Sequence, residues 1–134
     1  MRDGGVDGFV EAYEKSDPPT PEKWRSTLQT VLRQRLGAHE HPDAVADALQ
    51  AVPRSRPFEM REQLREIAAP TVVVADRDEP DPGHPLAIGE LYASLIPGAR
   101  LVVEEEGQSP IAWQGGQLSK VIATVAAQAA AASA

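Results

Sequence analysis

The chain has 134 residues, which is enough for one domain with its own hydrophobic core. Its net charge of −7, without a clustered basic patch, argues against nucleic acid and anionic membranes as partners. The sequence has no cysteine, which excludes disulfides and thiolate metal sites. Because no apolar run approaches the roughly 18 residues of a membrane span and no secretory signal begins the chain, we expect a cytoplasmic protein.

The first half of the sequence predicts helices joined by polar connections. A short helix is expected over residues 6–15, with its apolar side chains on one face. The next helix has the clearest signals, because Thr20 offers a hydroxyl cap, Pro21 suits the first helical position and Gly37 suits the end. A third, shorter helix is expected before Pro53.

The second half alternates strands and helices. The apolar runs at 71–75 and 101–103 are too continuous for strands with one solvated face, so they predict a parallel sheet covered on both faces. The apolar stripe over residues 86–96 predicts the crossover helix between them. A flexible joint is expected at Gly115 and Gly116, followed by a helix that continues into the alanine-rich tail.

The fold class is therefore α/β. A helical front half over residues 1–66 is followed by a β-α-β-α unit of a parallel sheet over residues 67–134. Residues 58–67 are expected to pack against the core from the end of the front half. Polar residues follow each predicted strand, where parallel sheets place their chemistry: Asp76, Asp78, Glu79 and Asp81 after the first, and Gly107, Gln108 and Ser109 after the second.

Three segments resemble parts of the α/β-hydrolases. Residues 67–74, IAAPTVVV, followed by Asp78, Glu79 and Pro80, are similar to the strand and acid turn of that family. Residues 96–103, IPGARLVV, are similar to its last strand and lead-in, and GQSP at 107–110 is similar to its glycine-histidine-serine-proline turn. The resemblance covers about residues 64–125 and implies a partial α/β-hydrolase fold, with the front half as the cap or lid.

The resemblance implies ester-type or amide-type hydrolysis of a small molecule in a full-length relative, through an acyl-enzyme. The acid would be Asp78, which is the shorter carboxylate and closer to the strand end, or Glu79, which precedes the proline as the family acid often does. Gln108 occupies the histidine position, and an amide cannot accept and return a proton near neutral pH. No G-x-S-x-G elbow is present, so the nucleophile half is absent. We therefore expect a degenerate triad, no triad-type activity and no cofactor.

Other interpretations of the same residues stay open. The acidic loop is also consistent with a solvated segment that caps the next helix. Asp76 and Asp78 are also consistent with the D-x-D motif of aspartate-dependent phosphatases, which hold Mg²⁺. The phosphatase interpretation is disfavoured, because that family expects threonine or valine where Pro80 stands. His84 lies near the acids and could replace the lost base, but an exposed loop histidine is the favoured interpretation.

His39 and His41 could touch a metal, but two such ligands without a third favour an exposed turn instead.

A different class of function follows from the sheet itself. Two parallel strands with apolar faces need cover for their faces and edges, and the edge beside residues 72–74 expects another strand. The alternative prediction is therefore a non-catalytic binding or assembly module that self-associates, takes a partner chain to complete its sheet, or is marginally stable.

Overall fold

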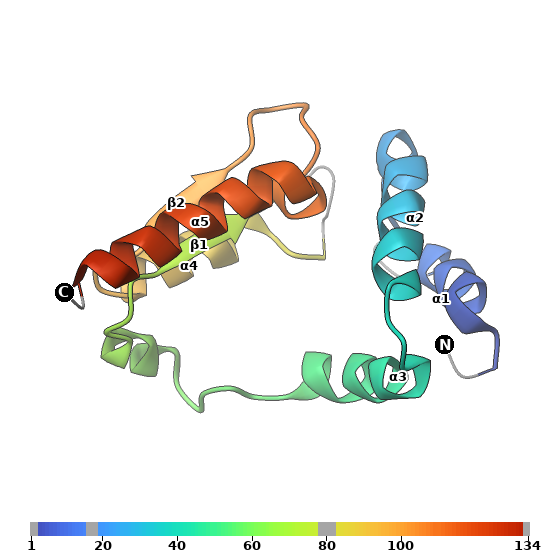
Figure 1. Cartoon of the computed structure of the whole chain (residues 1–134), viewed down its shortest axis with the longest axis horizontal. Helices are drawn as coiled ribbons and strands as arrows, with labels where there is room; N and C mark the ends of the chain where they lie inside the picture. The colour runs from blue at the N-terminus through green and yellow to red at the C-terminus, as the bar shows by residue number, and fades with distance from the viewer. Residues whose placement is uncertain (1–2, 16–18, 78–82, 133–134) are drawn as a thin grey trace. The chain divides into compact units, whose positions relative to one another are not determined.

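The computed structural model describes residues 3–15, 19–77 and 83–132. The chain divides into two compact units, one ending at Pro57 and the other beginning at Phe58 (Figure 1). The boundary between the compact units lies between residues 57 and 58. The physical reason is that the Phe58 ring packs edge-on against Tyr92 of the second unit, with 6.2 Å between ring centroids, and that Leu64 is buried there. The mixed α/β class is confirmed.

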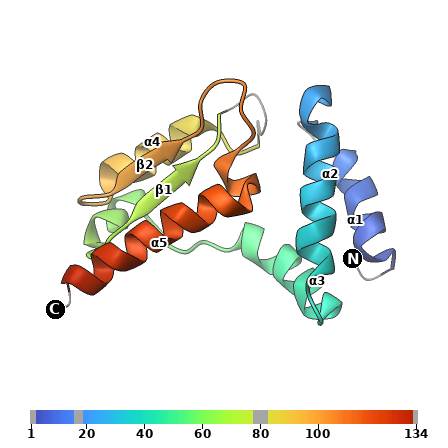
Figure 2. The same cartoon turned by 45° about the horizontal axis from the view of Figure 1, so that its top comes forward.

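The first unit consists of helices α1 (Gly5–Glu14), α2 (Glu22–Gly37) and α3 (Pro42–Ala51), followed by one 3₁₀ turn, η1 (Val52–Arg54). Helix α1 lies along α2 in both views (Figures 1 and 2), where Val10 from α1 and Trp24 and Leu28 from α2 are buried. The predicted cap at Thr20 is wrong: the cap position is Pro21, and no side chain caps this helix. The predicted end at Gly37 is confirmed.

The second unit begins with the 3₁₀ segment η2 (Arg61–Glu66) and continues with β1 (Val72–Ala75), α4 (Leu86–Leu95) and β2 (Arg100–Val103). A 3₁₀ turn, η3 (Ile111–Trp113), and the long helix α5 (Gly115–Ala132) complete it. Strands β1 and β2 are parallel, with Val72 opposite Arg100 and Ala75 opposite Val103. The predicted crossover through a helix is therefore confirmed. The sheet lies between α4 and α5 (Figures 1 and 2).

Helix α4 packs closely on β1 because it carries a glycine at the contact. A Cβ built on Gly89 would lie 2.5 Å from the Cβ of Ala75 and 3.7 Å from a methyl group of Val73. The face of β1 formed by Val73 and Ala75 therefore meets α4, and the opposite face, formed by Val72 and Val74, meets the α5 side. The glycine sets the spacing between α4 and the sheet.

The strands are less covered than the continuous apolar runs predicted. Only Ala75 of β1 is buried, and the valines of both strands are half-buried, so the prediction of full cover on both faces is wrong for the described residues. Ile88 of α4 belongs to the predicted apolar stripe but is exposed, and Ile122 of α5 is exposed as well. Gly115 and Gly116 do not form a joint before the last helix, because α5 begins at Gly115.

Candidate functional site

Of the predicted site positions, the structure describes those that directly follow β1 and β2 but not the candidate acids. Asp78 and Glu79, the two candidates for the acid, fall outside the described residues, as does Asp81. Asp76 and Arg77 come directly after β1 and are half-buried. Gln108 is exposed in the connection between β2 and η3. Asp76 and Gln108 therefore come after neighbouring parallel strands, β1 and β2.

Glu104 and Arg77 form a pair of hydrogen bonds that joins the ends of the two strands. The backbone N–H of Arg77 donates to Oε1 of Glu104 over 2.7 Å, and Nε of Arg77 donates to the backbone oxygen of Glu104 over 2.9 Å. Glu104 is 5% exposed, and its Oε2 is buried without a hydrogen-bond partner among the described residues. The pair therefore fixes where the chain leaves β1 toward residues 78–82.

Gln108 sits at the end of a tight turn that presents its side chain to solvent. Its backbone N–H donates to the oxygen of Glu105 over 3.1 Å, and Gly107 has φ of 77°, which is typical of the third residue in a type II turn. The following Pro110 is fully buried, and Nε2 of Gln114 donates to the Ser109 oxygen over 2.6 Å. The turn is therefore anchored, and its last residue, Gln108, offers an amide, which is not a proton-transfer group.

A groove of about 440 Å³ with a mixed polar and apolar lining, here called the β2 groove, lies between the end of β2 and the start of α5. Its volume falls within the range of small-molecule sites. Carboxylates, amides and one ammonium group surround a few apolar side chains: Val102, Val103, Glu104, Glu105, Gln108, Ile111, Gln114, Gln117, Lys120 and Val121. These groups can donate and accept hydrogen bonds, and the groove contains no histidine, serine or cysteine that would act as base or nucleophile.

A second groove, here called the β1 groove, lies on the other side of α5 and has a volume of about 450 Å³. It runs between β1 and the helix and is apolar apart from one threonine, with Pro70, Thr71, Val72, Val74, Leu118, Val121, Ile122, Val125 and Ala126 along it. No charged residue lines it. The two sides of the sheet thus differ in chemistry, with charges and amides at β2 and hydrocarbon at β1.

The backbone of β1 is paired on one side only. The N–H of Arg100 donates to the Thr71 oxygen over 3.1 Å, and backbone groups of successive strand residues point alternately to the two sides. Thr71, Val73 and Ala75 therefore face β2, whereas Val72 and Val74 direct their N–H and C=O groups away from it. Outside the β1–β2 ladder, no described residue bonds the backbone of Val72 or Val74.

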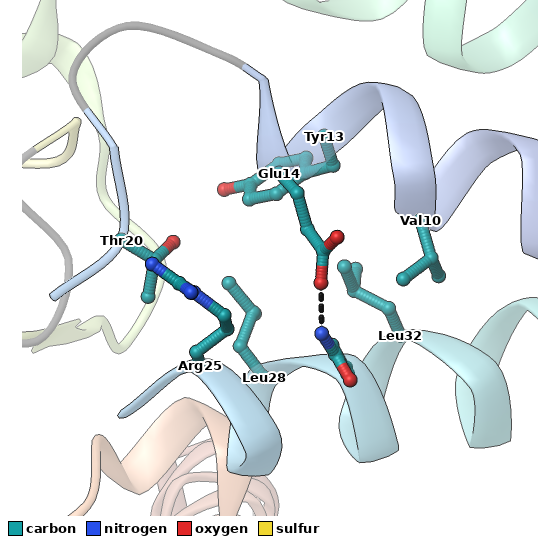
Figure 3. Close-up of a pocket in the computed structure, with 8 residues that line it drawn as sticks. Val10, Tyr13, Glu14, Thr20, Arg25, Leu28 and Leu32 are labelled. Atoms are coloured by element: carbon teal, nitrogen blue, oxygen red, sulfur yellow. Dashed lines mark hydrogen bonds between the residues drawn. The ribbon is translucent and has the colours of Figure 1, made fainter. Parts of the chain in front are cut away.

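The space between α1 and α2 in the first unit is too small for a ligand. Figure 3 shows it between Val10, Tyr13 and Glu14 of α1 and Leu28 and Leu32 of α2. Its volume is about 10 Å³, which corresponds to a single water molecule. The Gln29 amide donates to Glu14 across it. This space is a packing defect between two helices.

The histidines do not form a metal site in the part of the chain that the structure describes. His39, His41 and His84 are exposed, and no group of three or more histidine or acidic side chains among the described residues could hold a metal ion. The exposure of His39 and His41 agrees with their interpretation as parts of an exposed turn.

The sequence alone did not single out Glu104 as a candidate residue. A signal was present: Glu104 continues the alternation of Arg100 and Val102, which places its side chain on the α5 face, next to the groove. Its partner, Arg77, lies 27 residues earlier and could not be recognised from local pattern.

Comparison of the chain with family models, with curated proteins and with solved structures gives no match. Among the described residues, no helix combines the length and the apolar character that crossing a membrane requires.

Proposed function

We propose that the second unit is a non-catalytic assembly module that accepts a further β-strand at the edge of β1. The observation that carries this proposal is the outward-facing backbone of Val72 and Val74 above the apolar β1 groove. An extended segment laid along this edge would pair its main chain with β1 and place alternate side chains in the groove, which is the mode of β-strand addition.

The cost of leaving this edge open supports the proposal. Two-stranded sheets are marginally stable, and an unpaired edge strand is normally shortened, bulged or charged. The β2 side follows this rule with Glu104, Glu105 and Lys120 along its groove. The β1 side does not, because its groove has no charge, and Ile122 is 59% exposed there. The uncharged edge is therefore the one suited to a partner.

Amide hydrogen exchange tests strand acceptance directly. At low protein concentration, Val73 and Ala75 should be protected by the β1–β2 ladder, and Val72 and Val74 should exchange quickly. A short peptide that alternates valine with threonine should then slow exchange at Val72 and Val74. Exchange at these two amides that stays fast under saturating peptide would contradict the proposal.

A second proposal concerns the origin of the fold. We propose that the chain corresponds to the cap and the last two β-α units of an α/β-hydrolase, whose fuller form cleaves ester-type or amide-type bonds of a small molecule. The parallel β1–α4–β2 crossover supports it, because the acidic segment and the Gln108 turn follow neighbouring strands. Asp78 or Glu79 would be the acid in such a relative, and Gln108 would mark a lost base.

This second proposal predicts no triad-type turnover from the chain itself. With a p-nitrophenyl ester as substrate, the protein and its Gln108→His variant should both match the rate of the buffer, because a restored histidine still lacks a serine nucleophile. Turnover that disappears on Asp78→Asn would contradict the expectation, since it would show a working acid in this chain.

A further inference from the structure

The strand at the open edge is itself the kind of strand that the β1 groove would accept. We infer that the occupant of the β1 groove is a second copy of this chain, paired through its own β1 in antiparallel orientation about a twofold axis. This inference rests on the proposed strand acceptance and names its partner. It follows from the chemistry of the groove, from the charge of the chain and from the geometry of the ladder.

The chemistry is self-complementary. An apolar groove beside a free edge suits a strand of β-branched residues, and β1 itself is a run of three valines and an alanine. Val72 and Val74 direct their side chains toward the groove and their backbone groups toward the open edge. A second β1 therefore brings the same side chains to the groove, and its outward-facing backbone groups can pair with those of the first β1. Both copies then use the same surface, as an isologous contact requires.

The charge distribution allows two copies to meet at this surface. The chain has a net charge of −7, so most approaches between copies bring like charges together. The β1 groove has no charged residue, and α5 carries a single one, Lys120, which lines the opposite groove. The β1 edge is thus a surface where two acidic chains can associate without opposing carboxylates.

The ladder selects one register. In an antiparallel pair, residues that exchange both backbone hydrogen bonds must both face the partner strand. Among the registers that meet this condition, Val72 opposite Val74 of the second copy is the one that pairs the outward-facing backbone of both residues in both copies within the strand, and it places Val73 opposite Val73 of the second copy on the axis. Residues opposite each other share a face of the sheet, so the two α5 helices would lie on the same face with their Ile122 side chains near the junction.

The size of the groove sets the expected strength. Nine residues line the β1 groove, whereas a standard interface uses roughly 20–30 residues on each side. The association should therefore be concentration dependent, with monomer at low concentration. Measurement over a wide concentration range is needed to see it.

The absence of native cysteine permits a precise cross-linking test on the full chain. Val73→Cys would place two thiols at a pair whose Cα atoms are about 4.5 Å apart, within the range of disulfide geometry. Leu101→Cys is the matched control, because Leu101 lies beside Val73 in register and is similarly half-buried, but belongs to β2. Mild oxidation should convert Val73→Cys to a dimer of twice 14.4 kDa and leave Leu101→Cys monomeric.

A second pair of variants separates pairing from folding. The Val74 N–H points away from β2, so Val74→Pro removes a donor needed by the second copy and none from the β1–β2 ladder. Light scattering should show loss of the dimer for Val74→Pro and its retention for Val74→Thr, with Val73 and Ala75 amides protected in both.

Equal cross-linking of Val73→Cys and Leu101→Cys, or a monomer at every concentration, would overturn the second-copy inference. If a monomeric chain still gained protection at Val72 and Val74 from the valine–threonine peptide, strand acceptance would stand with another partner. If the peptide also failed, both the inference and the proposed function would fall.

Discussion

Arg77 and Glu104 are joined by two reciprocal hydrogen bonds, each between the side chain of one residue and the backbone of the other. The backbone N–H of Arg77 reaches the Glu104 carboxylate, and the Arg77 guanidinium reaches the Glu104 carbonyl oxygen. Because Glu104 directly follows β2 and Arg77 lies two residues after the end of β1, the pair sets the separation and direction of both segments as they leave the sheet.

Replacement of Glu104 should therefore destabilise the second unit. Glu104→Ala leaves a part-buried Arg77 N–H without its acceptor, which costs about 1–3 kcal/mol. Glu104→Gln keeps one acceptor oxygen, so it should lower the stability of the second unit by less than Glu104→Ala does. Urea denaturation followed by Trp113 fluorescence measures both, and equal losses would show that the carboxylate oxygen is not what matters.

Gly89 should not tolerate alanine, although alanine is the better helix former. The new methyl group would meet the Ala75 Cβ at 2.5 Å, and overpacking of this kind costs about 1–3 kcal/mol, more than the roughly 1 kcal/mol gained in helix propensity. Gly116→Ala in α5 is the control, because no atom lies within 4 Å of its added Cβ. Thermal unfolding should show a lower midpoint for Gly89→Ala and an equal or higher one for Gly116→Ala.

The two units should unfold separately, and each contains one tryptophan to report it. Trp24 belongs to the first unit and Trp113 to the second. Phe58→Ala removes the edge-on contact with Tyr92, worth about 0.5–1.5 kcal/mol beyond the lost burial. In a Trp24→Phe background the transition seen by Trp113 should shift to lower urea, whereas in a Trp113→Phe background the Trp24 transition should not move. A shift of both would contradict the division at residue 58.

Within the first unit, packing should outweigh charge. Arg33 and Asp7 form an ion pair at 3.0 Å, but their side chains are 46% and 78% exposed, so Asp7→Asn should cost under about 1 kcal/mol. Leu28 is only 8% exposed, so its replacement by alanine should lower the free energy of unfolding by about 2–5 kcal/mol. Trp24 fluorescence in urea measures both, and a larger effect from Asp7→Asn would contradict this ranking.

The order of helices and strands in the second unit could be predicted because it depends on local periodicity. The runs at 71–75 and 101–103 and the stripe between them appear as β1, β2 and α4 within one residue at each end. The burial of those strands could not be predicted, because a continuous apolar run indicates that a strand can be buried but not which element covers it. Val72 and Val74 face a groove rather than a packed helix.

The start of α2 and the contacts between distant residues could not be predicted either. Thr20 carried a cap signal, but Pro21 takes the cap position with ψ of 140°, which leaves Thr20 outside the helix. The Arg77–Glu104 pair depends on strand register, which no local pattern specifies. Asp78 and Glu79 stay a prediction from resemblance, since they lie outside the described residues.

Helix α5 is much longer than the strands beneath it. Its 18 residues extend about 27 Å, whereas four strand residues extend about 13 Å. Its final turns, almost all alanine, therefore have little sheet to pack on, and their helicity depends on the intrinsic preference of alanine. Removal of residues after Ala129 should thus shorten the molecule without loosening its core, which makes this end of the chain a natural attachment point for a fused reporter.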